Sequence, residues 1–212
     1  MSETSYSPLL YRFCQRALHV FLKLYNRLEV YGREHIPRQG GVLLVANHVS
    51  FIDPPALGCA ADCRIVRYMA RDTLFSPPWF GRLLRGVAVV PISRSKGDIR
   101  ALRTALAVLK GGDCLGFFPE GTRSPDGTMQ PAKGGVGFLI AKAGVPVVPA
   151  FIDGSYQALA RHHRCVRPCK VRVFVGPAID PAEFERLNEG PDPYTQIGSL
   201  VMDRIRALAP TP

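Results

Sequence analysis

His48 and Asp53 are the residues whose types and spacing most clearly suggest chemistry. They lie in one stretch, Ala46-Asn47-His48-Val49-Ser50-Phe51-Ile52-Asp53-Pro54-Pro55, which follows an apolar run at 41–45 and precedes a helical pattern. This order predicts a compact loop between a buried strand and a helix, where α/β folds place their functional residues. A histidine whose second ring nitrogen faces a carboxylate is a general base with a fixed tautomer. The pattern therefore predicts base catalysis, and no Ser or Cys need be the nucleophile if the substrate brings its own hydroxyl.

Both residues also have an ordinary structural interpretation. Asp53 before two prolines is a good helix N-cap, with Pro54 at the first helical position. A single histidine in a loop is usually a polar surface residue. The further motifs in the chain favour chemistry over this alternative.

A second candidate site follows the predicted strand 114–118, in Phe118-Pro119-Glu120-Gly121-Thr122-Arg123. Glycine lets backbone N–H groups approach an anion, and arginine binds phosphate through two parallel donors. Two more cations lie at the ends of predicted elements. Arg94 follows the strand 87–92, and Lys133 lies just before the helix 135–143. Together they predict an anion site for a phosphorylated polyol. The alternative is a surface turn with a Glu120–Arg123 pair.

Strand and helix patterns alternate almost throughout the chain, which predicts one α/β domain with a mostly parallel central sheet flanked by helices. We expect this domain, residues 30–212, to be preceded by an amphipathic helical segment, residues 1–29. Expected strands cover 30–36, 42–45, 64–70, 87–92, 114–118, 145–152 and 170–175. Expected helices cover 55–63, 74–84, 99–110, 135–143, 181–188 and 194–208.

The N-terminal segment from Pro8 to Leu28 has a helical pattern with two distinct sides. Its apolar side is expected to hold Leu10, Phe13, Cys14, Ala17, Phe21, Leu24, Tyr25 and Leu28. Its basic side holds Arg12, Arg16, His19, Lys23 and Arg27. Such a helix is typical of a membrane interface. The alternatives are an ordinary helix packed on the domain core, or one that does both.

The composition indicates which class of partner the protein binds. The 212 residues are 47% hydrophobic and carry a net charge of +10, which indicates a globular core and an anionic partner. Because no basic blocks alternate with aromatic residues, we expect a membrane surface and phosphorylated substrates rather than nucleic acid.

The six cysteines are expected to be free thiols. His162, His163, Cys165 and Cys169 match no common zinc spacing, so no metal is expected. No stretch has the length of a membrane span, about 20 apolar residues, and the polar first residues do not resemble a signal peptide.

Four blocks in this order carry a family resemblance: Asn47-His48-x4-Asp53, then Arg94, then Phe118 to Arg123, then Val145-Pro146-Val147-Val148-Pro149. Over residues 30–180 the chain resembles the glycerolipid acyltransferases, and more closely the bacterial 1-acyl-glycerol-3-phosphate acyltransferases. The family's second block often has an acidic or amide residue before its arginine, where this chain has Ser93. That difference leaves the fine selectivity for the acceptor open.

The resemblance implies a role for each matching position. His48 would take the proton of the acceptor hydroxyl as it attacks an acyl thioester, and Asp53 would orient His48. Glu120, Gly121, Thr122 and Arg123 would form the acceptor-binding block, with Arg123 and Arg94 on the phosphate and Lys133 beside it. Val145 to Pro149 would shape the site or the acyl channel. No metal, cofactor or covalent intermediate is implied, since the thioester is already activated.

The expected reaction is therefore acyl transfer from acyl-CoA or acyl-carrier protein to 1-acyl-sn-glycerol-3-phosphate, giving phosphatidic acid. The expected location is peripheral, on the cytoplasmic face of the cell membrane. One alternative is a different acceptor, such as another lysophospholipid or lyso-ornithine lipid. A thioesterase is a further alternative, but it would leave residues 120–123 without a role. The last alternative is a protein that binds membranes without catalysis and in which the motif is vestigial.

Overall fold

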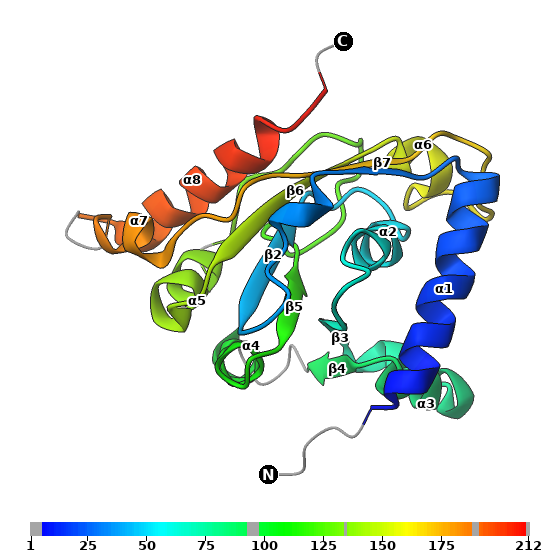
Figure 1. Ribbon diagram of the computed structural model, residues 1–212, viewed down its shortest axis with the longest axis horizontal. Coiled ribbons are helices and arrows are strands. Elements are labelled where there is room, and N and C mark those ends of the chain that lie inside the picture. The colour runs from blue at the N-terminus through cyan, green and yellow to red at the C-terminus, as the bar shows by residue number, and fades with distance from the viewer. Residues whose placement is uncertain (1–5, 93–97, 134, 188–190, 211–212) are drawn as a thin grey trace.

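The computed structural model describes residues 6–92, 98–133, 135–187 and 191–210. Arg94, one of the predicted phosphate ligands, lies outside these residues. In the described part of the chain, a central sheet is covered by helices on both faces (Figure 1). This confirms the predicted α/β class and the predicted single domain with a mostly parallel sheet.

The sheet has seven strands in the order β1-β7-β6-β2-β5-β3-β4. Five neighbouring strands, from β6 to β4, run parallel, whereas β7 is antiparallel to β6 and pairs in parallel with β1. The strand bounds are β1 Glu29–Tyr31, β2 Val42–Ala46, β3 Val66–Arg71, β4 Val89–Ile92, β5 Cys114–Phe117, β6 Val147–Asp153 and β7 Arg172–Val175. All seven expected strands are therefore present, most of them shorter than expected.

The α-helices are α1 Pro8–Tyr25, α2 Asp53–Ala60, α3 Pro78–Gly86, α4 Asp98–Lys110, α5 Gly135–Ala143, α6 Ser155–Leu159, α7 Pro181–Glu185 and α8 Pro193–Arg206. Two short 3-10 helices are η1 Arg33–His35 and η2 Asp72–Phe75. The single helix expected at 74–84 is thus a 3-10 turn followed by α3. The short α6 was not predicted from the sequence.

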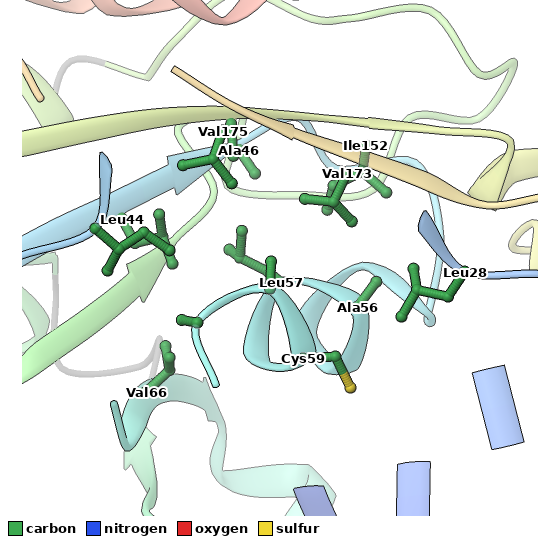
Figure 2. Close-up of a cluster of buried hydrophobic side chains, with 14 of the residues drawn as sticks. Leu28, Leu44, Ala46, Ala56, Leu57, Cys59, Val66, Ile152, Val173 and Val175 are labelled. Carbon is green, nitrogen blue, oxygen red and sulfur yellow. The ribbon is translucent and has the colours of Figure 1, made fainter. Parts of the chain in front are cut away.

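The strand β2 lies at the centre of the sheet, and all five of its residues are buried. Leu44 and Ala46 face the α2 side, where they pack with Leu57 and Val173 (Figure 2). Leu43 and Val45 belong to the core on the opposite face, which α4, α5 and α8 cover; that core includes Leu109, Leu139 and Ile197. Because both faces are covered, β2 is apolar along its whole length, and its carboxyl end is a rigid platform for the loop that follows.

The side of α1 that packs on the domain is narrow and partly polar. The helix contacts α2 and the sheet through Tyr11, Gln15 and Leu22, while most of the predicted apolar side is exposed. Gln15 Nε2 donates to the carbonyl oxygen of Gly58 at 2.7 Å, and the Tyr11 hydroxyl accepts the N–H of Val66 at 2.9 Å. These polar tips satisfy buried backbone groups. The sequence left a membrane interface, packing on the domain core, or both as alternatives for this helix, and the hydrophobic pattern alone did not show which side packs on the domain.

None of the helices in the described residues is both long enough and apolar enough to cross a membrane.

Candidate active site

The loop that holds His48 leaves the sheet at the carboxyl end of β2, between β5 and β6. Asn47 fixes this point: its side-chain amide donates to the carbonyl oxygen of Ile152 at 3.0 Å and accepts the N–H of Ile152 at 2.7 Å. The buried amide continues the pairing of β2 with β6 by one more residue. His48 therefore starts from a fixed backbone at the edge of the parallel strands.

His48 and Asp53 are in direct contact. The Nδ1 atom of His48 lies 2.9 Å from Oδ2 of Asp53. A carboxylate only accepts hydrogen bonds, so Nδ1 carries the proton and Nε2 is left as a proton acceptor. The side chain of Asp53 is 0% exposed and that of His48 is 17% exposed. The pair therefore combines a buried orienting group with a base that a substrate can reach.

Asp53 is not the N-cap that the sequence suggested. It is the first residue of α2, and its Oδ2 accepts the backbone N–H groups of Val49 at 2.7 Å and Ser50 at 2.6 Å. Pro54 and Pro55 have no N–H to donate to a cap, so the carboxylate instead faces back into the loop. One oxygen atom thus receives three donors and folds the loop around the imidazole.

The loop at 118–124 holds the backbone of His48 from the other side. Glu120 Oε1 accepts the N–H of His48 at 2.7 Å, and the N–H of Ser124 donates to the carbonyl oxygen of His48 at 2.8 Å. Glu120 is 1% exposed, and its Oε2 accepts the N–H of Gln130 at 3.1 Å. Burial raises the pKa of Glu120. The carboxylate that the resemblance assigned to acceptor binding is therefore occupied by two backbone N–H groups.

Aromatic rings support the imidazole. The ring of Phe118 stacks on that of His48 with centroids 4.1 Å apart, and Tyr68 lies beyond Phe118 at 6.4 Å. The hydroxyl of Tyr68 donates to the carbonyl oxygen of Pro54 at 2.7 Å. This column restricts the rotation of His48 and gives one side of the site an apolar wall.

Arg123 provides the cation of the site. Its guanidinium carbon lies 3.4 Å from the centre of the half-exposed Phe51 ring, a cation–π contact. Its Nη1 is buried and has no hydrogen-bond partner among the residues that the structure describes. Burial lowers the pKa of Arg123, and the nearby positive charges of Arg161 and Arg71 add to that effect. Three positive charges, one of them on the partly buried guanidinium of Arg123, favour an anionic ligand.

The remaining predicted residues lie at the rim. Gly121 has φ +64°, a left-handed conformation, and a Cβ built there would lie 3.0 Å from Cδ of Lys133 and 3.5 Å from its Nζ. The Lys133 chain thus lies along Gly121, and its backbone N–H donates to Pro119 at 3.0 Å. Thr122 is exposed. The fourth block continues into β6, where Pro149 pairs with Val45 of β2, so it forms part of the sheet beside the loop.

Sequence reasoning missed two features of this site. Arg71 ends β3, and Arg161 follows α6. Their positive charges nevertheless reach Arg123. The position of Arg71 at a strand's carboxyl end was the available signal, whereas nothing local in the sequence distinguishes Arg161 from its basic neighbours.

The arrangement suits proton transfer beside an anion. His48 can accept a proton at Nε2, Asp53 can stabilise the resulting imidazolium, and Arg123 can bind an anionic group near Phe51. The residues described contain no group of three or more His, Cys, Asp or Glu side chains placed to hold a metal ion.

A family model described as acyltransferase matches residues 27–153, more than half of the chain. The chain belongs to the acyltransferase family. The acyltransferase is 29% identical over 178 residues to the 1-acyl-sn-glycerol-3-phosphate acyltransferase of Bacillus subtilis (strain 168), covering 84% of this chain and 86% of the relative. It is 31% identical over 158 residues to the 1-acyl-sn-glycerol-3-phosphate acyltransferase alpha of Mus musculus, covering 70% of this chain and 54% of that protein.

A solved structure agrees with this assignment. The crystal structure of the 1-acyl-sn-glycerophosphate (LPA) acyltransferase PlsC from Thermotoga maritima superposes with a TM-score of 0.74 at 28% identity, covering 93% of this chain and 80% of that one. The family and the fold together identify this protein as an O-acyltransferase, as the motifs predicted.

Proposed function

We propose that this acyltransferase transfers an acyl chain from acyl-CoA or acyl-carrier protein to the free hydroxyl of 1-acyl-sn-glycerol-3-phosphate, giving phosphatidic acid. The observation that carries the proposal is the contact of His48 with Asp53 beside the partly buried guanidinium of Arg123, whose buried Nη1 has no hydrogen-bond partner among the described residues. The printed names of the bacterial and mouse relatives support the choice of acceptor.

The proposed reaction uses the substrate's own hydroxyl as nucleophile. The hydroxyl oxygen attacks the thioester carbonyl carbon while His48 Nε2 takes the hydroxyl proton. Asp53 stabilises the imidazolium through Nδ1. As the tetrahedral intermediate collapses, the carbon–sulfur bond breaks and the imidazolium returns its proton to the leaving thiolate. A positioned base of this kind contributes a factor of about 10²–10⁴. We propose no metal or cofactor, since a thioester is already activated.

The two loops have separate proposed roles. Glu120 positions the backbone of His48, because both of its oxygens accept backbone N–H groups. Arg123 binds the acceptor's phosphate, with Lys133 beside it, and the left-handed Gly121 with the exposed Thr122 brings the chain close to that phosphate. Arg94 belongs to the same proposed phosphate site by its place in the motif. Each bidentate contact between arginine and phosphate is stronger than a neutral hydrogen bond.

We also propose that the enzyme lies on the cytoplasmic face of the cell membrane as a peripheral protein. The exposed side of α1 carries Leu9, Phe13, Val20 and Leu24, of which Leu9 is 84% and Leu24 78% exposed. These residues recur at spacings of four and seven and lie opposite the buried side of the helix. The exposed Arg16 and Lys23 lie on the same helix, and the exposed Arg27 follows its C-terminal end. An apolar stripe with nearby cations suits an anionic bilayer, where the lysophosphatidate acceptor resides.

The test is the purified full chain with lysophosphatidate and each acyl donor, with products identified by mass spectrometry. We expect phosphatidic acid from the native enzyme and a loss of about 10²–10⁴-fold in His48→Ala. His162→Ala, an exposed histidine outside the pair, is the matched control and should keep full activity. Full activity in His48→Ala would refute the base mechanism. Free fatty acid as the main product would indicate a thioesterase, and product only from another lysolipid would change the acceptor.

A further inference from the structure

A second exposed apolar surface adjoins the N-terminal end of α1. The N–H of Ser7 donates to the carbonyl oxygen of Gly86, the last residue of α3, at 3.0 Å. Figure 1 places α3 beside that end of α1. On α3, Trp79 is 71% exposed, and it is the only tryptophan in the chain. Leu74 on η2, which packs against α3, is also exposed.

Between α3 and the two residues that precede α1 lies a groove of about 570 Å³, lined by Tyr6, Ser7, Pro78, Arg82, Arg85 and Gly86. Arg82 and Arg85 are three residues apart on α3 and therefore share one side of it. Both are exposed, and neither makes an ion pair within the described residues. Neither α1 nor α3 has an acidic residue in its first turn. The groove therefore combines two unneutralised cations with neighbouring apolar side chains.

A bilayer surface matches this combination better than a protein or a nucleotide does. Tryptophan prefers the membrane–water interface, where its ring is in an apolar layer and its N–H meets polar groups. Arginine binds phosphate groups at the same depth, and its aliphatic stem can lie along the apolar layer. The strongly exposed Leu9 and Phe13 lie on the neighbouring end of α1. An acidic protein would match the cations but not the exposed apolar residues.

We propose that α3 is a second membrane-contact element, in which Trp79 enters the interface of an anionic bilayer while Arg82 and Arg85 bind lipid phosphate groups in the groove. The inference rests on the proposed membrane association through α1. Its consequence is a defined orientation: a single amphipathic helix can roll about its axis, whereas a second contact beside its N-terminal end prevents that rotation. The domain, with its active site, then meets the lipid surface in one pose.

The native chain reports directly on this contact, because its fluorescence comes from Trp79 alone among tryptophans. We expect a blue shift of the emission on adding vesicles of phosphatidylglycerol mixed with phosphatidylcholine, and quenching when the lipids carry brominated acyl chains. Co-sedimentation of the protein with vesicles without any shift or quenching would overturn the inference. A shift on binding an acidic carrier protein, with none on vesicles, would overturn it in favour of a protein partner.

A reporter on α1 separates this inference from the proposed function. In the double variant Trp79→Phe, Leu24→Trp, the single tryptophan lies on the exposed side of α1. A shift in this variant without a shift in the native chain leaves the association through α1 intact and refutes only the contact of α3. No shift in either protein, with no co-sedimentation, refutes the proposed membrane association as well.

The arginines are tested by Arg82→Gln combined with Arg85→Gln. We expect the partition coefficient into phosphatidylglycerol vesicles to fall at least tenfold, with little change for pure phosphatidylcholine. The matched control is Arg100→Gln combined with Arg103→Gln, an exposed pair on α4 with the same spacing and the same loss of charge. An equal loss in both double variants would show a general charge effect and overturn the proposed groove.

Discussion

Glu120→Gln separates a positioning role from a substrate-binding role, because the new side chain keeps the shape of the old one and loses one acceptor. Glu120 is buried, and its two oxygens accept the N–H groups of His48 at 2.7 Å and Gln130 at 3.1 Å. An amide has one oxygen and one NH₂ group, so one of the two backbone donors must face another donor. We expect the oxygen to remain on the closer N–H, that of His48, and the contact with Gln130 to be lost.

The expected loss of stability in the Glu120 variants follows from the burial of the backbone N–H groups that Glu120 accepts. A buried backbone donor left without an acceptor costs about 1–3 kcal/mol. For a chain of this length, each kcal/mol lowers the melting temperature by about 2–4 °C. Glu120→Ala removes both acceptors and frees the His48 backbone, and a catalytic group displaced by about 1 Å can cost on the order of 10²-fold in rate. We therefore expect kcat to fall by about that factor in Glu120→Ala and by less in Glu120→Gln.

The assay is the initial rate of phosphatidic acid formation over a range of lysophosphatidate concentrations, with thermal unfolding measured on the same protein. A positioning residue should lower kcat and the melting temperature while KM for the acceptor changes little. Glu185→Gln, an exposed glutamate on α7, is the control and should change neither. A rise in KM of about tenfold, equivalent to about 1.4 kcal/mol, with kcat and melting temperature unchanged, would refute the positioning role.

Three further predictions follow from the contacts described. Arg123→Lys keeps the charge but loses the paired donors, so KM for lysophosphatidate should rise about 10–100-fold, the equivalent of about 1.5–3 kcal/mol. Gly116→Ala would place a Cβ 2.2 Å from the ring of Tyr68, so urea unfolding should show a loss of about 1–3 kcal/mol. Gly58→Ala, with its nearest atom at 3.5 Å, should be neutral or slightly stabilising. Hydrogen bonds from Thr128 and Ser124 lower the pKa of Asp126 to about 2, so Asp126→Asn should reduce stability at pH 7, with the difference shrinking between pH 3.8 and 2.

A specific result would contradict each of these predictions. Arg103→Lys on the exposed side of α4 should leave KM unchanged, and an equal rise there would remove the special role of Arg123. Equal stability of the Gly116→Ala and Gly58→Ala variants would show that Tyr68 can move aside. For Asp126 the sign follows from a carboxyl pKa that is lower in the folded than in the unfolded state, so its stabilisation is lost as the pH falls. A difference that stays constant from pH 7 to pH 3 would contradict it.

Much of the site could be predicted because its signals are local. The apolar run at 41–45 and the loop after it placed His48 and Asp53 at a strand's carboxyl end, and residues 135–143 were predicted to be a helix with the bounds that α5 has. The contact of the Asp53 carboxylate with His48 was part of the predicted mechanism, but its two further contacts could not be predicted. They depend on how Val49 and Ser50 fold back onto the start of α2.

The side of α1 that packs on the domain could not be predicted from hydrophobic periodicity, for a related reason. Tyr11 and Gln15 face inward because their polar atoms meet backbone groups of α2 and β3, partners that are 43 to 55 residues away in the sequence. Hydrophobic periodicity records which side chains avoid water, and it does not distinguish a protein core from a lipid surface. Only the folded chain shows that the strongly apolar side of α1 remains exposed.

The sequence by itself determined the class of fold, the alternation of strands and helices and the residues of the two motifs, because periodicity, turn residues and motif spacing act over a few neighbouring positions. The tertiary structure decided the strand order, the antiparallel β7 and the contact between the two loops, since these depend on pairings between distant segments. It also decided the role open to Glu120: burial under the loop places its carboxylate on the His48 backbone, 72 residues away in the chain, and no local pattern carries that information.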